Sequence, residues 1–290
     1  MIIDHSIINY FDKFFLYLGK FYYNFNLFNR NEIRILTYHD IEKKYEKKFF
    51  TQLKSLKKNW NFISTIEFEE HLSKKKILKG KNLLITFDDG FKSNYLIANK
   101  ILNRFKIKAI FFVPSEFIKI KSKIKSKNFV KQNILDRSYS NDNYIPSNMS
   151  MNNLKSLLKL GHTIGCHTKS HKMLSEIKDI KEMKHEVLDS AKYLENALNI
   201  TIKHFAYTYG NFKSINNLSL KVSLSKFNFI YSSFRGNNYN NKNKTIIKRD
   251  TVYLDKKNNL LLIFLSGLFD LTYLFQIKSI NKLIKKIIKQ

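Results

Sequence analysis

The chain of 290 residues has one cysteine, Cys166, and only 8 glycines and 2 prolines. A single cysteine excludes an intramolecular disulfide and fits a reducing compartment. So little glycine and proline excludes a collagen-like repeat or a proline-rich linker. The hydrophobic fraction of 43% is that of a globular protein, and the length suits one large α/β domain or two small ones.

Acidic residues are also scarce: the chain has 23 of them and 52 basic residues, which gives a net charge of +29. Nucleic acid, anionic lipid or acidic glycan could each match such a charge. Arginine supplies only 6 of the basic residues, and the lysines are spread over nearly every segment. No basic run alternates with aromatic side chains as in a nucleic-acid groove. We therefore predict no nucleic-acid partner, and a general drift toward Lys and Asn explains the charge as well as a binding patch does.

Residues 1–30 lack the basic start and the small-residue cleavage site of a secretory signal peptide. Their apolar side chains recur at helical spacing from Ile7 to Phe25, which predicts an amphipathic helix with one aromatic side. We therefore expect a cytoplasmic protein.

The longest apolar stretch, residues 260–275, is 16 residues long and includes Asp270. A membrane-spanning helix needs ~20 apolar residues. The segment that follows, 276–290, is basic and amphipathic. Residues 256–290 thus predict a helical tail that either packs on the core or lies on an anionic membrane, at its inner face if the protein is cytoplasmic.

Between these ends, residues 31–255 alternate short apolar runs with amphipathic helical stretches, and residues 119–149 interrupt the alternation. This pattern predicts an α/β fold with a parallel sheet or barrel, and an insertion that covers one face of it. No internal repeat is visible. The predicted strands are 33–39, 60–64, 82–87, 107–113, 161–167, 203–208, 227–232 and 245–252.

Polar residues follow two of these strands directly. Asp88 and Asp89 come after the strand at 82–87, and His167 and His171 lie at the end of the strand at 161–167. The carboxyl ends of parallel strands meet at one rim, where sites are built. Two adjacent carboxylates repel each other, and a metal ion nearby would favour their ionised forms.

Two histidines four residues apart can hold one metal ion, and one carboxylate completes the three-ligand site of catalytic zinc. Zinc lowers the pKa of a bound water to ~7, and the second carboxylate could then take its proton. Each motif alone has a simpler explanation, because surface histidines and a type I turn produce the same letters.

Taken together and in this order, the motifs resemble those of the polysaccharide deacetylases of carbohydrate esterase family four, the NodB-homology domain. The matching stretches are Thr86–Gly90 (TFDDG), His167–His171 (HTKSH) and Tyr207–Gly210 (YTYG), and the approach LGHTIGCH at 160–167 is also similar. The resemblance covers residues 31–255 and implies a distorted (β/α) barrel of about seven strands.

The resemblance also implies roles for single residues. Asp89, His167 and His171 would bind zinc or another divalent metal, Asp88 would be the general base, and the backbone N–H of Tyr209 would help hold the oxyanion.

Three residues beside these ligands have supporting roles in our interpretation. Thr168 and Ser170 could hold the metal ligands in place through hydrogen bonds. Cys166 precedes His167, and we expect it to fill a buried strand as a small apolar side chain.

Three departures from the family pattern weaken the catalytic interpretation. Ala206 stands where the family often has an arginine that orients the base, and Thr208 stands in place of the usual proline. No histidine follows His204, so the late histidine that commonly acts as general acid has no match. Arg235 and Arg249 remain as candidates to pair with Asp88, although an ordinary structural role is the commoner one for each.

His39 is our candidate for the missing acid. It ends the first predicted strand and should face the rim, whereas the other unassigned histidines lie in helices or at the starts of strands. A structural histidine is the alternative. The unassigned histidines are His5, His71, His162, His185 and His204.

These features predict a metal-dependent hydrolase that removes an N-acyl group, above all N-acetyl, from a sugar in a glycan or glycolipid precursor. The precursor could be lipid-linked or nucleotide-linked. An O-acetyl esterase or a deformylase would use the same mechanism. An alternative function that is not enzymatic is an inactive barrel that binds glycan or anionic membrane. The departures from the family pattern favour this alternative. The intact Asp-Asp and His-His pairs argue against it.

Overall fold

The computed structural model describes residues 12–25, 31–135, 144–241 and 245–289. Some parts of the predicted regions lie outside the described residues. They are residues 1–11 with His5, residues 26–30, residues 136–143 of the predicted insertion, and Gln290.

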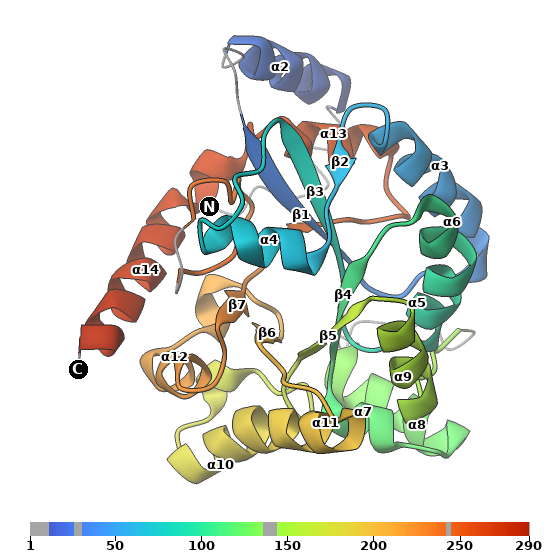
Figure 1. Ribbon diagram of the computed structural model, residues 1–290, viewed down its shortest axis with the longest axis vertical. Coiled ribbons are helices and arrows are strands. Elements are labelled where there is room, and N and C mark those ends of the chain that lie inside the picture. The colour runs from blue at the N-terminus through green and yellow to red at the C-terminus, as the bar shows by residue number, and fades with distance from the viewer. Residues whose placement is uncertain (1–11, 26–30, 136–143, 242–244, 290) are drawn as a thin grey trace.

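One curled sheet of parallel strands forms the centre of the protein, and helices surround it (Figure 1). The strand order is β7-β6-β5-β4-β3-β1-β8, and the short strand β2 pairs with β3. The predicted α/β fold, a distorted barrel of parallel strands, is confirmed. The strands are β1 Glu32–Tyr38, β2 Asn61–Phe62, β3 Lys81–Phe87, β4 Ala109–Val113, β5 Thr163–Cys166, β6 His204–Ala206, β7 Phe229–Tyr231 and β8 Asp250–Thr251.

Both faces of the sheet are buried, which explains why the strands are continuous apolar runs without polar alternation. Ile33 and Ile35 of β1 point into the barrel and join an inner cluster with Ile110 and Phe112 of β4. Leu36 belongs to the larger outer cluster, which is formed with the surrounding helices. Successive side chains of one strand point to opposite faces of the sheet, and they therefore fill two separate cores.

The barrel closes through the segment that follows β7. Ile247 pairs with Tyr231 of β7, and Asp250 of β8 pairs with Leu36 of β1. The predicted strand 245–252 is regular only at Asp250–Thr251, because the chain has to cross from one edge of the sheet to the other.

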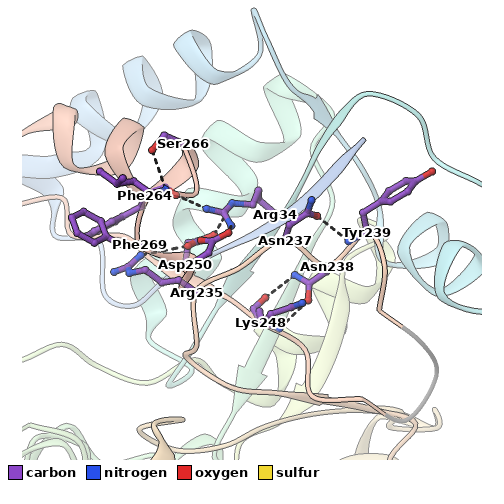
Figure 2. Close-up of polar contacts among 12 residues, drawn as sticks. Arg34, Arg235, Asn237, Asn238, Tyr239, Lys248, Asp250, Phe264, Ser266 and Phe269 are labelled. Carbon is purple, nitrogen blue, oxygen red and sulfur yellow. Dashed lines mark hydrogen bonds and ion pairs between the residues drawn. The ribbon is translucent and has the colours of Figure 1, made fainter. Parts of the chain in front are cut away.

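Asparagine side chains complete this closure. The Asn238 amide donates to the carbonyl of Lys248 at 2.9 Å and accepts from the N–H of Lys248 at 2.9 Å, while the backbone of Asn238 donates to Ile33 in β1 at 2.9 Å (Figure 2). The side-chain amide thus substitutes for a strand at this edge.

Helices alternate with the strands, as the sequence pattern predicted, and two of the long helical segments contain a π-helical turn. One consists of α5 Lys92–Ile97, π-helix η2 Ala98–Leu102 and α6 Asn103–Phe105. The other consists of α10 Ile180–Lys184, π-helix η5 His185–Asp189 and α11 Ser190–Leu198. The other helices of the barrel are η1 Lys43–Tyr45, α3 Glu46–Leu56, α4 Thr65–Leu72, α9 Met151–Lys159, η4 Leu174–Glu176, η6 Phe212–Ser214 and α12 Asn217–Leu224.

The segment predicted as an insertion begins with helical elements that lie over the carboxyl ends of the strands. α7 Ser115–Lys119 leads into α8 Lys123–Phe129 and the π-helix η3 Val130–Ile134. Phe117 and Phe129 stack at 4.8 Å between ring centroids and tie α8 to the end of β4. The boundaries of the three predicted regions of the chain stay a prediction.

The terminal helices pack against the barrel and against each other. They are α2 Asp12–Phe25, α13 Asn258–Leu265, 3-10 helix η7 Asp270–Tyr273 and α14 Leu274–Lys289. Phe15 of α2 lies 5.6 Å from Phe269 between ring centroids, in a small cluster that includes Phe264. Ile280 and Ile284 of α14 are buried in the main core. The apolar faces of α13 and α14 therefore pack on the core, one of the two arrangements that the sequence allowed.

No single helix of the described segments has the length and apolar character of a membrane span. The pair formed by α13 and residues 270–289 meets those criteria only jointly, and it is bent by 68°.

Candidate active site

The first polar motif lies directly after β3, at the carboxyl rim of the barrel. The backbone N–H of Asp88 donates to the carbonyl of Tyr38 at 2.9 Å, which extends the pairing with β1 by one residue. The Asp88 carboxylate accepts two hydrogen bonds from the Arg249 guanidinium, Nη1 to Oδ1 at 2.7 Å and Nη2 to Oδ2 at 2.9 Å. Both side chains are buried, and this bidentate pair fixes the carboxylate in one orientation.

Arg249 thus partners Asp88, and our preference for an ordinary structural role was wrong for this arginine. Its Nε donates to the carbonyl of Ser232 at 2.9 Å, and its backbone N–H donates to Phe234 at 2.8 Å. Arg235 does not reach the rim; its nearest carboxylate is Asp250 at 3.5 Å. An arginine from the last strand therefore pairs with Asp88, whereas the matching position in the third motif is occupied by an alanine.

Three predicted metal ligands meet next to this pair. The Oδ1 atom of Asp89 lies 3.4 Å from Nε2 of His167 and 3.2 Å from Nε2 of His171. All three side chains are buried, and one potential ligand atom from each lies within 4.8 Å of the others. Oδ2 of Asp88 is 4.0 Å from Nε2 of His167. The structure thus places the predicted base beside the predicted ligands.

The hydrogen bonds of the two histidines show that the cluster suits a cation. Nδ1 of His167 lies 2.8 Å from the carbonyl oxygen of Ala206, and Nδ1 of His171 lies 2.8 Å from that of Asn133. A carbonyl oxygen only accepts, so each Nδ1 carries a hydrogen, and Nε2 is the ring atom turned toward Asp89. Nε2 can offer the carboxylate a proton or offer a metal ion a lone pair, and the His₂Asp set is one that zinc favours.

The electrostatics of the cluster agree with this. Burial would raise the pKa of Asp89, but hydrogen bonds from His167 and His171 hold it well below its ordinary value. Burial would lower the pKa of His171, but its hydrogen bond with Asp89 raises the pKa above the usual range. Protons and a metal ion therefore compete for the same atoms, so metal affinity should fall as the pH falls.

The backbone around the cluster is held in an uncommon conformation. Asp89, Thr168, His171 and Tyr209 have φ angles of +70°, +64°, +66° and +61°, and they are four of the seven non-glycine residues with positive φ in the described chain. Such residues persist only where the surroundings impose them, and they concentrate at functional sites.

Glu186, in the π-helix η5, imposes this conformation on the loop between the histidines. Its carboxylate accepts from the N–H groups of Lys169 and Ser170 at 3.1 Å and 2.9 Å, and from the Ser170 hydroxyl at 2.6 Å. The Thr168 hydroxyl accepts from the N–H of His171 at 3.0 Å. Thr168 and Ser170 therefore brace the loop as expected. No sequence motif pointed to Glu186, which is buried within the π turn.

A cavity of about 240 Å³ opens above the cluster. A neighbouring cavity of about 550 Å³ shares His39, Asp89, Ile134 and Tyr253 with it. Ile134 comes from the predicted insertion, which therefore forms one wall of the site. The smaller cavity is lined by Thr37, His39, Asp88, Asp89, Ile134, His167, His171, Tyr207, Tyr209, Ser233, Arg249, Thr251 and Tyr253.

Both remaining predicted site residues lie on this cavity. His39 is exposed and lines both cavities, and its charge helps to lower the pKa of Asp89 after the contributions of His167 and His171. Tyr209 is 49% exposed, and its ring centroid lies 5.4 Å from that of His171. Their catalytic roles stay predictions.

The other histidines of the described segments lie away from the cavity. His162 accepts from the N–H of Ala109 at 3.1 Å, and burial lowers its pKa to about 4. His71 lies 2.9 Å from the carbonyl of Tyr239, and His204 lies 2.9 Å from a carboxylate oxygen of Glu69. His185 is exposed on η5.

The only cysteine also has a structural environment. Cys166 is fully buried in β5, with Sγ 3.4 Å from the hydroxyl of Ser190. Burial raises the pKa of its thiol to about 12, so the side chain is uncharged and unreactive.

Comparison with known proteins extends this description. The polysaccharide deacetylase family model matches residues 75–224, which include Asp88, Asp89, both cluster histidines and Tyr209, but neither His39 nor Arg249. No curated protein sequence matches the chain.

Several solved structures share the fold. The Streptococcus pyogenes deacetylase PplD, solved with acetate, is 20% identical with a TM-score of 0.62, over 80% of this chain and 98% of that one. IcaB from Ammonifex degensii is 19% identical with a TM-score of 0.62, over 83% and 98%. The BpsB deacetylase domain from Bordetella bronchiseptica is 16% identical with a TM-score of 0.60, over 77% and 98%.

Proposed function

The chain belongs to the polysaccharide deacetylase family, and from that premise we propose that it hydrolyses the N-acetyl group of a sugar with the help of a divalent metal ion, zinc by preference. The observation that carries the proposal is the buried Asp88–Arg249 pair beside the Asp89–His167–His171 cluster. One carboxylate lies outside the cluster and is held in one orientation by Arg249, while the other faces Nε2 of two imidazoles. This division of roles is what metal-assisted hydrolysis requires.

Asp89, His167 and His171 would hold the ion, which when bound would acidify a water molecule and polarise the acyl carbonyl. Asp88 then takes the proton of the attacking water. Arg249 holds both of its oxygens, so the base cannot turn away. The backbone N–H of Tyr209, on the same cavity, would stabilise the oxyanion of the tetrahedral intermediate.

We propose an N-acylated sugar of a glycan or glycolipid precursor, lipid-linked or nucleotide-linked, as the substrate. The cavity of about 550 Å³ beside the cluster offers it room and aromatic side chains, including Tyr45, Phe91 and Tyr144. The alternative of an inactive barrel rested on the departures in the third motif and on the missing late histidine. The Arg249 contact supports activity by replacing the missing motif arginine. An O-acetyl ester or a formyl amide would fit the same residues.

Release of acetate tests the proposal. Purified protein loaded with Zn²⁺ is incubated with N-acetylglucosamine oligomers and with lipid-linked and nucleotide-linked N-acetyl sugars, and acetate and free amine are both measured. We expect stoichiometric acetate and amine from at least one sugar. Acetate from O-acetyl sugars alone would make the protein an esterase, and no product from any of these substrates with full metal occupancy would favour the inactive barrel.

His39 is the proposed general acid, because an amine leaves a tetrahedral intermediate only if it is protonated. We expect His39→Ala to keep metal and fold but to slow turnover of an N-acetyl sugar by ~10²-fold. Turnover of an O-acetyl ester should fall much less, since an alkoxide leaves more easily than an amine. Equal slowing of both would indicate positioning of the substrate, and no slowing would leave His39 a structural residue.

We also propose a peripheral contact with anionic membrane, made by the terminal helices. Phe14, Tyr17 and Phe21 form one exposed face of α2, with exposed fractions of 58%, 71% and 61%. α14 has no acidic residue and exposes all five of its lysines. Aromatic and basic groups of this kind favour a lipid–water interface. A cytoplasmic location at the inner face of the membrane stays a prediction.

Co-sedimentation with vesicles checks this contact. We expect binding to anionic vesicles at low salt and release at high salt. Tyr17→Ser/Phe21→Ser should abolish binding, whereas Ile66→Ser/Ile124→Ser, which changes equally exposed apolar residues of the barrel helices, should not. Failure of the unchanged protein to bind at low salt would exclude the contact.

A further inference from the structure

Four charged side chains join the C-terminal segment to the strand next to Arg249. Nη1 of Arg34 in β1 lies 2.7 Å from Oδ2 of Asp270 in η7, and its Nε lies 3.3 Å from Oδ2 of Asp250 in β8. Arg235 approaches the other oxygen of Asp250 at 3.5 Å. Figure 2 shows Asp250 between the two arginines. Three of the four side chains are at most 5% exposed, and Asp270 is 22% exposed.

The C-terminal segment supplies more than the Asp270 carboxylate to this group, which we call the charge cluster. The Arg34 guanidinium also donates to the backbone carbonyl of Phe264 in α13 (Figure 2). The Arg235 guanidinium lies over the Phe264 ring, 3.3 Å from its centroid. Both arginines that flank Asp250 are therefore held from α13 and η7.

The Asp250 carboxylate is held mainly by its two ion pairs. Its oxygens lie 3.3 Å and 3.5 Å from nitrogens of Arg34 and Arg235 and make no close, well-aligned hydrogen bond with either. Burial raises its pKa to about 6, against the opposing effects of Arg34 and Arg235. Removal of one charge from a buried group of this kind leaves its partners uncompensated, which is costly.

Asp250 follows Arg249 directly in the chain, so a displacement of Asp250 would also displace Arg249 in the active site. β8 is two residues long and pairs with β1 only at Leu36 and Thr37. Backbone hydrogen bonds from Arg249 to Phe234 and from Val252 to Thr37 hold its two ends, and the ion pairs of Asp250 hold its middle. Successive side chains of a strand point to opposite faces. Asp250 therefore turns outward to the charge cluster, while Arg249 turns inward to Asp88.

We propose that Asp270, Arg34 and Phe264 are positioning residues for the hydrolysis: they anchor β8 from the C-terminal segment and so set Arg249 against Asp88. The inference rests on the proposed function and deepens it, because it makes α13 and η7 part of the catalytic unit. None of the three residues touches the cavity above the metal cluster.

Asp270→Asn tests the inference, because it removes one charge from a partly exposed carboxylate and keeps its shape. We expect kcat for the N-acetyl substrate to fall about tenfold, KM to change less than twofold and the metal content to stay constant. Asp270→Glu should recover most of the rate. Phe264→Leu, which removes the ring under Arg235, should act in the same way and covers the case in which Asp270→Asn folds poorly.

Glu195→Gln is the matched control. Glu195 is 20% exposed and pairs with Lys226 at 2.7 Å, which is similar to Asp270 with Arg34, but it lies on α11. This variant should lose a similar amount of thermal stability and keep kcat. Equal kcat in Asp270→Asn and Glu195→Gln would overturn the inference.

A second measurement does not depend on turnover. The Nε–H of Arg249, which donates to Ser232, gives a side-chain signal in ¹H–¹⁵N NMR spectra that Arg249→Lys identifies. We expect this signal to shift and its hydrogen to exchange faster in Asp270→Asn but not in Glu195→Gln. If unchanged protein hydrolyses no substrate, the proposed function fails while this signal still tests the anchoring of β8; an unchanged signal would overturn the anchoring itself.

Discussion

Alanine in place of His171 should remove the bound metal ion and the hydrolytic activity together. His171 is one of three groups whose ligand atoms lie within 4.8 Å of one another, and its Nδ1–H is already committed to the carbonyl of Asn133. Only Nε2 is left to face the cluster. Two ligands hold a divalent ion far less tightly than three, so we expect affinity for Zn²⁺ to fall by at least ~10²-fold.

Metal content by mass spectrometry and titration with Zn²⁺ measure the effect, and acetate release is recorded on the same samples. His162→Ala is the matched control, because His162 is 4% exposed where His171 is 6% exposed, and it also bonds a backbone group. It should keep its metal although it destabilises the fold. Asp89→Ala should behave like His171→Ala. Full metal occupancy in His171→Ala would contradict the assignment of this ligand.

Local sequence patterns were enough to predict the part of the site that lies at the ends of the strands. Asp88 and Asp89 follow a seven-residue strand, and His167 follows a four-residue one, so the rule that parallel strands end at one rim was enough to bring them together. The structure adds that the backbone has positive φ at two of the ligands, Asp89 and His171.

Long-range contacts lie beyond such patterns. Arg249 is 161 residues from Asp88, and it reaches the rim only because the chain crosses from β7 to β1 to close the barrel. Arg34 lies within an apolar strand, and its partner Asp270 is 236 residues away. A pairing of this kind depends on which edge a segment joins, and no periodicity in the sequence contains that information.

The predicted strand 245–252 is shorter in the structure for a related reason. The segment 245–252 has the β-branched composition of a strand, but only two residues pair regularly, since the barrel edge is completed by Asn238. By its composition alone, the tail 256–290 could have packed on the core or lain on an anionic membrane. Burial of Ile280 and Ile284 shows that packing used its apolar face, while the lysines of α14 stayed outside.

Asp88→Asn should slow hydrolysis by ~10²–10⁴-fold and leave the metal in place. The amide has nearly the shape of the carboxylate, but it cannot take a proton from water. Asp88 is not one of the three clustered groups, and its Oδ2 lies 4.0 Å from Nε2 of His167. Steady-state acetate release together with metal content therefore separates this variant from His171→Ala, which should lose both.

Substitution of Arg249 should also slow the proton transfer to Asp88, but by less than substitution of Asp88 itself. Arg249→Lys keeps the charge but replaces two parallel hydrogen bonds, at 2.7 Å and 2.9 Å, by one flexible contact. We expect a loss of ~10–10²-fold in kcat with little change in KM, because the arginine touches the base and not the substrate.

The two residues act as one unit if Arg249 works only through Asp88. In that case the double variant Asp88→Asn/Arg249→Lys should be no slower than Asp88→Asn alone, since an oriented amide is no better a base than a loose one. Multiplied losses in the double variant would show that Arg249 contributes a separate interaction. A normal rate in Asp88→Asn would exclude Asp88 as the base, whatever the behaviour of Arg249.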